Sequence, residues 1–181
     1  MVTVTTLPAR PFSRADLDAM PNDGHRYELI DGVLVVTPSP SPDHQRFSRG
    51  VFLLLHTACP DDLEVLYAPF DVAIADDTVM QPDLLVAARD DFTDRDLPVA
   101  PVLAVEILSP STRRFDLTLK RSRYESAGTA SYWVVDPDEL SLTAWDLVDG
   151  AYVEVAHVTG EEEWTAASPF PVTIVPAALK G

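Results

Sequence analysis

The chain has 181 residues, 46% of them hydrophobic, and this composition is typical of a globular protein and excludes a disordered one. No apolar run approaches the ~20 residues of a membrane-spanning helix, and the single cysteine, Cys59, excludes an internal disulfide and a thiolate zinc cluster. The 29 acidic and 13 basic side chains give a formal net charge of -16, which argues against a simple nucleic-acid-binding module because such modules bind phosphates with basic groups.

Residues 1–12 are expected to form a loose arm. They lack the charged and long apolar regions of a signal peptide, so a cytoplasmic protein is expected. A short helix is predicted at 14–20, because Ser13 can cap it and acids lie in its first turn. Asp31-Gly32 then indicates a tight hairpin turn, which needs positive φ at both central positions. The two strands of this hairpin are expected at 26–30 and 33–37.

Ser41 can cap a second helix that has Pro42 as its first residue and runs to about Cys59. The stretch 63–75 is interpreted as a strand pair or as one long strand interrupted near Pro69, followed by a turn at Asp76-Asp77. Asp83 opens the apolar strand 84–88, and a charged surface loop follows at 89–96. The remaining elements are a strand at 102–108, a helix at 115–127 that ends at Gly128, a strand at 131–136, a C-terminal β-meander at 140–147 and 152–158, and a short strand at 170–175.

Three charged residues interrupt apolar patterns in the middle of the chain. Glu106 lies within the continuous apolar run 102–108, which is typical of a strand buried on both faces, where an ionised carboxylate is costly unless a cation holds it. Lys120 lies in the stripe of the following helix that should face the sheet. Asp83 immediately precedes a second apolar strand, at 84–88. Two neighbouring carboxylates suit a hard divalent cation such as Mg²⁺, and a nearby lysine could orient or deprotonate a water molecule.

Each of these residues also has an ordinary structural interpretation. Asp116 and Lys120 could form an i,i+4 surface pair. Glu106 could be the partner of a structural arginine, Arg113 or Arg114. Asp83 could simply cap a turn. His44, at the start of a helix, could contact substrate or phosphate, although such a histidine more often caps the helix or lies exposed.

The ordered set of motifs resembles the PD-(D/E)XK nuclease superfamily and, more specifically, the Uma-type restriction endonuclease family, over roughly residues 25–175. The resemblance implies an α/β (α+β) fold, a restriction-endonuclease-like core with a central mixed sheet flanked by helices, in one domain over 1–181. The motifs are YELIDG at 27–32, Pro82-Asp83, VEILSPST at 105–112, the helix that carries Lys120, and SYWVVDP at 131–137.

The resemblance also implies an active site. Asp83 and Glu106 would be metal ligands, and Glu28 matches an early acidic position that completes or tunes the metal site. The chain departs from the superfamily pattern at Leu108, where the usual lysine is missing, and Lys120 fits as its replacement by position and by helical face. All four residues would be catalytic, with Mg²⁺ or alternatively Mn²⁺ as the cofactor.

The leading hypothesis is therefore a metal-dependent endonuclease that hydrolyses DNA phosphodiester bonds. The alternative is a catalytically inactive relative that keeps the nuclease fold as a binding or assembly module, which the acidic composition favours. The resemblance further implies a homodimer, because restriction-type nucleases often pair two active sites to cut both strands. No membrane partner is expected.

Overall fold

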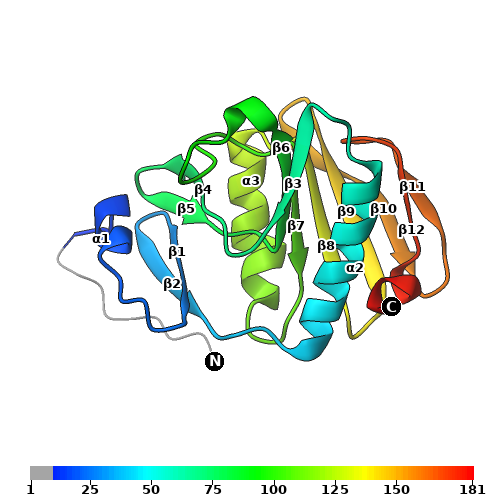
Figure 1. Cartoon of the computed structure of the whole chain (residues 1–181), viewed down its shortest axis with the longest axis horizontal. Helices are drawn as coiled ribbons and strands as arrows, with labels where there is room; N and C mark the ends of the chain where they lie inside the picture. Colours follow the sequence, from blue (N-terminus) through cyan, green and yellow to red (C-terminus); the bar gives the residue numbers. More distant parts are fainter. Residues whose placement is uncertain (1–9) are drawn as a thin grey trace.

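A six-stranded mixed sheet forms the centre of the computed structural model, which describes residues 10–181 (Figure 1). The strand order is β10-β9-β8-β7-β6-β3, and β7 and β8 are parallel while the other neighbours are antiparallel. Helices flank this sheet, which confirms the predicted fold class. The strands are β3 (Leu63–Tyr67), β6 (Leu84–Ala88), β7 (Leu103–Ile107), β8 (Ser131–Asp136), β9 (Ser141–Val148) and β10 (Ala151–Thr159).

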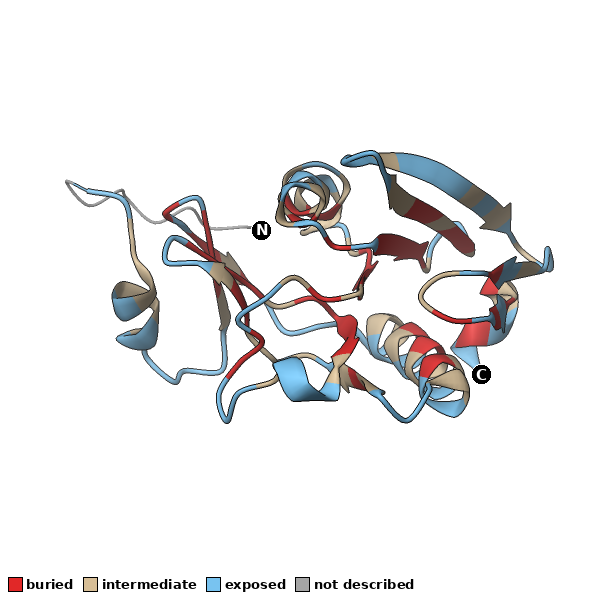
Figure 2. Ribbon diagram, turned by 90° about the horizontal axis from the view of Figure 1, so that it is seen from above, coloured by how far each residue is buried: buried red, intermediate tan, exposed pale blue. Residues whose placement is uncertain are grey.

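The central strands are buried because each face of the sheet has its own apolar layer. On β7, Leu103, Val105 and Ile107 belong to one core cluster, and Ala104 and the following Leu108 belong to the other. Alternate residues of a strand point to opposite faces, so a strand covered on both sides is apolar throughout. Figure 2 shows the buried residues, in red, concentrated in the strands that lie between the two longer helices.

Helix α2 (Pro42–Ala58) covers one face, and it starts as predicted, because the Ser41 side chain accepts a hydrogen bond from the backbone N–H of His44. The hairpin β9–β10 confirms the predicted meander. A short two-stranded sheet of β11 (Trp164–Ala166) and β12 (Val172–Ile174) and the 3₁₀ helix η3 (Pro176–Lys180) pack on the same side as α2. No helix within residues 10–181 is long and apolar enough to cross a membrane.

The opposite face packs against a helical segment and a second sheet. The helix expected at 115–127 consists of a π-helical turn, η2 (Phe115–Lys120), and the α-helix α3 (Arg121–Ala127), which ends at Gly128 with a φ of 87°. The second sheet has the order β2-β1-β5-β4, and its residues Ile30, Val35, Val72 and Met80 share a core cluster with Tyr124 and Tyr132. Its strands are β1 (Arg26–Ile30), β2 (Val33–Thr37), β4 (Val72–Ala75) and β5 (Thr78–Met80).

The N-terminal elements lie on the outer side of this second sheet. The short helix α1 (Arg14–Asp18) packs there through Leu17, which contacts Leu29 and its neighbours. Asp31 and Gly32 form the predicted hairpin turn with φ values of 52° and 72°. The expected loose arm is described only from residue 10 on, and this part is anchored, since the Phe12 N–H donates to the carbonyl of Gly32 at 2.9 Å.

Several details differ from the sequence-based expectation. The stretch 63–75 contains two strands with the predicted interruption around Pro69, but they do not pair with each other, because β3 belongs to the central sheet and β4 to the second sheet. Both β5 and β11 have three residues, which is too short to leave a recognisable period of two in the sequence. The charged loop after β6 contains a single 3₁₀ turn, η1 (Arg89–Asp91).

Candidate active site

Asp83 and Glu106 meet across two neighbouring antiparallel strands. Leu84 of β6 pairs with Val105 of β7, so extending this register by one residue sets Asp83 opposite Glu106. The backbone N–H of Ile107 donates to Asp83 Oδ2 at 2.8 Å. Asp83 is therefore bound to the neighbouring strand and is not a local turn cap. Both carboxylates are buried.

Lys120 joins these residues from η2, and its side chain is only 3% exposed. Its Nζ lies 2.9 Å from Glu28 Oε1, 3.1 Å from Glu106 Oε1 and 3.7 Å from Asp116 Oδ1. Glu28 comes from β1 of the second sheet, and its Oε1 also accepts the backbone N–H of Gln81 at 2.7 Å. The structure thus brings Lys120 together with two of the three predicted acids, at the junction of the two sheets.

The ordinary interpretations of Glu106 and Lys120 are wrong. Asp116 and Lys120 are 1% and 2% exposed, so they do not form a surface pair. Arg113 pairs with Asp136 and Glu139 and does not contact Glu106. The partner of Glu106 is the lysine of the following helical segment.

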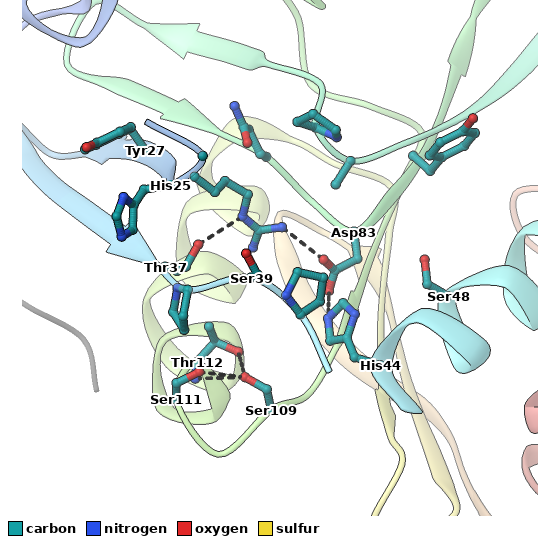
Figure 3. Close-up of a pocket in the computed structure, with 18 of the residues that line it drawn as sticks. His25, Tyr27, Thr37, Ser39, His44, Ser48, Asp83, Ser109, Ser111 and Thr112 are labelled. Carbon is teal, nitrogen blue, oxygen red and sulfur yellow. Dashed lines mark hydrogen bonds and ion pairs between the residues drawn. The ribbon is translucent and has the colours of Figure 1, made fainter. Parts of the chain in front are cut away.

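Arg26 is a member of the site that the sequence analysis missed. Its guanidinium lies 3.1 Å from Asp83 Oδ1 and 3.6 Å from Glu28 Oε2, so it links the two carboxylates. The signal was present, because Arg26 precedes Glu28 by two residues on one strand and so points to the same face. His44 Nε2 lies 3.1 Å from Asp83 Oδ2, so this histidine contacts the site instead of being merely exposed (Figure 3).

A cleft of about 770 Å³ opens in front of these residues. Its walls include Arg26, His44 and Asp83 together with the proline-rich segment 37–41 and the loop 109–112 (Figure 3). Within residues 10–181, the lining does not include Glu28, Glu106, Asp116 or Lys120, so these four lie behind Arg26 and Asp83. In the loop, the hydroxyl of Ser109 is within 3.0 Å of those of Ser111 and Thr112, which fits a structural role.

Burial and neighbouring charges set the protonation of the cluster. Burial lowers the pKa of Lys120, but Glu106, Glu28 and Asp116 outweigh it, so the pKa of Lys120 is raised and the ammonium stays protonated. Burial raises the pKa of Glu106 well above its ordinary value against the pull of Lys120, and raises the pKa of Asp116 to about 6. Burial also acts to raise the pKa of Asp83, but the His44 hydrogen bond and the Arg26 charge lower it overall.

The donor set suits a hard divalent cation that keeps much of its water. Four buried carboxylates, those of Glu28, Asp83, Glu106 and Asp116, face only two full cations, so with every acid ionised the cluster has two excess negative charges. Glu28 Oε2, Glu106 Oε2 and Asp116 Oδ1 are buried without a hydrogen-bond partner. Within residues 10–181 no three acidic, histidine or cysteine side chains are arranged as a metal-binding group. Mg²⁺ needs only one or two protein carboxylates, so this set fits it without forming a closed cage.

Comparison with known proteins agrees with this fold. The model of a family described as "Uma2: Putative restriction endonuclease" matches residues 14–178, so the chain belongs to this family. Membership places it among nucleases, which are hydrolases acting on nucleic acids. A solved structure described as "a putative nuclease belonging to DUF820" from Anabaena variabilis ATCC 29413 has a TM-score of 0.72 and 17% sequence identity, and the match covers 94% of this chain and 98% of that one. At this identity the likeness shows the fold. Among curated proteins no match was found.

Proposed function

We propose that the protein is a Mg²⁺-dependent endonuclease that hydrolyses phosphodiester bonds of DNA in the cleft lined by Asp83. The observation that carries this proposal is the buried Lys120 directly behind that cleft. Its Nζ lies 2.9 Å from a carboxylate oxygen of Glu28 and 3.1 Å from one of Glu106. Phosphoryl transfer depends mainly on positioning and on stabilising negative charge, and this cluster supplies fixed charges of both signs.

Asp83 and Glu106 would hold the metal ion, with Mn²⁺ as an alternative to Mg²⁺. When bound, the ion would supply positive charge next to the attacked phosphate and lower the pKa of a water molecule. Glu28 would tune the site from its place beside Lys120, since one of its oxygens is bound by Lys120 and by the Gln81 N–H. Arg26 and His44, which line the cleft next to Asp83, would add hydrogen-bond donors toward the substrate phosphate.

Lys120 would act as a fixed cation and hydrogen-bond donor. Its raised pKa keeps it protonated near neutral pH, so it would orient the attacking water and stabilise charge at the phosphate and would not act as a general base. Three carboxylates hold its Nζ in place, which removes the conformational freedom that a lysine side chain normally has.

The test is a cleavage assay on supercoiled plasmid DNA with Mg²⁺, Mn²⁺ or EDTA. Asp83→Asn and Lys120→Gln are expected to lower kcat by about 10²–10³, the usual cost of losing one group that stabilises the transition state. Circular dichroism checks that each variant is folded. Arg89→Ala, at an exposed arginine of η1, serves as the control and should cut like the wild type. Equal cleavage by all four proteins, or cleavage that persists in EDTA, would contradict the proposal.

The alternative, a non-cleaving binding or assembly module, has its own supporting observation. Arg26 already links Asp83 and Glu28, so the cluster can hold its shape with protein charges alone. Isothermal titration calorimetry separates the two functions. Saturable Mg²⁺ or Mn²⁺ binding that Asp83→Asn abolishes supports the nuclease, and the absence of any heat at millimolar metal supports the module.

A further inference from the structure

A groove of about 430 Å³ continues the cleft along helix α2. It shares Gln45, Ser48 and Tyr67 with the cleft, so the two cavities are contiguous. Residues 45, 48, 49 and 52 follow the spacing of three and four that places helix residues on one face. Figure 3 shows His44 and Ser48 one turn apart on α2, at the end of the cleft where Asp83 lies. The full lining is Gln45, Arg46, Ser48, Arg49, Phe52 and Tyr67.

An exposed aromatic ring forms one wall of the groove. Tyr67 ends β3, an edge strand of the central sheet, and is 60% exposed. Its ring meets Phe52 edge to face at a centroid distance of 5.2 Å, and Phe52 in turn stacks on His56 at 5.3 Å. Tyr67 is thus supported from below by α2 while most of its surface faces solvent. A large ring held in this way is a platform on which a flat aromatic group can stack.

The groove also has a local excess of positive charge. Arg49 has no carboxylate within salt-bridge distance among residues 10–181, whereas Arg46 and Lys180 share the single carboxylate of Asp43. Val65 of β3 packs against α2, and the side chain of the preceding Glu64 points to the opposite side of the sheet. There Glu64 pairs with Arg89, so it does not offset the charge of the groove. Three cations therefore face one acid beside the groove, in a protein whose formal net charge is -16.

We propose that this groove binds an unpaired strand of the DNA substrate as it leaves the cleft. Tyr67 stacks on a base, and Arg46 and Arg49 contact the phosphates on either side of it. The strand is unpaired because a base within a duplex is already stacked on its neighbours and cannot lie on Tyr67. The inference rests on the proposed function for the position of the reacting phosphate, but the binding itself requires neither metal nor cleavage.

Binding is measured by fluorescence anisotropy with a labelled oligo(dT) and with a blunt duplex of the same length, in EDTA. Tyr67→Ala is expected to weaken oligo(dT) binding about tenfold, whereas Tyr67→Phe, which keeps the ring, should bind like the wild type. Arg49→Ala should reduce the slope of log Kd against log salt by about 0.7, the contribution of one phosphate contact of a single strand. Tyr67→Ala should change the Kd for the duplex by less than the Kd for oligo(dT).

Two controls separate the groove from general surface effects. Arg89→Ala removes the same charge from an exposed site away from the groove, and Leu53→Ala removes an exposed apolar side chain of α2 that does not line it. Both should leave the anisotropy curve unchanged. Equal loss in Tyr67→Ala and Tyr67→Phe, or an unchanged salt slope in Arg49→Ala, would overturn the inference. Groove-dependent binding by a wild-type protein that cuts nothing would support the inference while contradicting the proposed function.

Discussion

Lys120 shows how a single charged residue can be held in an apolar interior. Its Nζ has carboxylate oxygens at 2.9, 3.1 and 3.7 Å, and they come from a strand of each sheet and from its own helical segment. Removing a charge from water costs several kcal/mol even in a real protein, so the lysine is stable there only while these partners surround it. The same partners hold its Nζ in one position between the two sheets.

Asp116 carries a pH-dependent cost. Its pKa rises from 3.8 to about 6 on folding, chiefly through burial, so between these pH values the folded protein binds a proton that the unfolded chain has released. The contribution of this group to stability is therefore complete at low pH and is lost as pH rises through the folded-state pKa. Asp116→Asn cannot ionise and avoids this loss.

We expect Asp116→Asn to gain stability relative to the wild type by about 3 kcal/mol between pH 4 and pH 7, which is the free energy of a pKa shift of about two units. Urea unfolding in EDTA at several pH values measures this difference, and the titrating groups that lie away from Asp116 cancel because both proteins share them. A difference that stays constant over the whole pH range would contradict the burial of this carboxylate.

Much of the cluster could be predicted from the sequence, because a charge that interrupts an apolar pattern is visible without a structure. Glu106, Lys120 and Asp83 were found in this way, and Glu28 through the motif around it. Arg26 was not found, because it stands at the start of its strand, where a basic residue is ordinary. Asp116 was considered only as a possible surface partner of Lys120, because an i,i+4 pair looks the same in the sequence whether it is buried or exposed.

At the scale of elements, helix α2 is held close to η3 at one glycine. A Cβ placed on Gly50 would overlap the carbonyl oxygen of Leu179 and approach its carbonyl carbon to 2.8 Å. Backbone atoms cannot move aside as a flexible side chain can, so the helix or η3 would have to shift. The position of α2 matters for the site, because α2 carries His44 and Ser48 into the cleft.

Gly50→Ala is therefore expected to destabilise the protein by about 1–3 kcal/mol, as overpacking typically does. The sign of this change in stability is informative, because replacing glycine by alanine in a freely exposed helix would stabilise the protein by up to about 1 kcal/mol. Thermal unfolding followed by circular dichroism measures the change. Ser126→Ala, at an exposed position of α3, is the control and should alter stability by less than about 0.5 kcal/mol. A gain in stability for Gly50→Ala would show that α2 and η3 are not in contact there.

The elements with a clear period or cap were predicted well. Ser41-Pro42 located the start of α2, and Asp31-Gly32 located the hairpin turn. The π-helical turn η2 was missed because its side chains have the same types as those of an α-helix. The separation of β3 from β4 was missed because local sequence does not say which sheet a strand joins. That choice depends on packing between distant residues, such as Val72, Tyr124 and Tyr132, which belong to one core cluster.

At the scale of the whole molecule, added salt should have opposite effects on the association of two copies of the protein and on the binding of DNA. We propose that the protein forms a homodimer, as two cuts on two strands would require. Two copies, each with a formal charge of -16, repel one another, and added salt screens this repulsion. Binding of DNA through basic groups weakens with salt instead. It releases counterions from the DNA, and this release becomes less favourable as the salt concentration of the solution rises.

Light scattering coupled to gel filtration tests the homodimer. The fraction with twice the monomer mass of 19.8 kDa should rise as NaCl is increased from about 0.05 M to about 0.5 M, over which the screening length falls severalfold. Anisotropy with labelled DNA over the same range should show weaker binding. A monomeric mass at every salt concentration would remove the homodimer from the proposal.

The cluster is assembled from parts that are far apart along the chain. Glu28, Asp83, Glu106 and Lys120 come from β1, the start of β6, β7 and η2, and they meet only where the two sheets pack together. During synthesis, a nascent chain that still lacks Lys120 holds Glu28, Asp83 and Glu106 with Arg26 as the one cation of the cluster. On the proposed function, a copy of the enzyme that ends before Lys120 would therefore be harmless to the DNA of the cell that makes it.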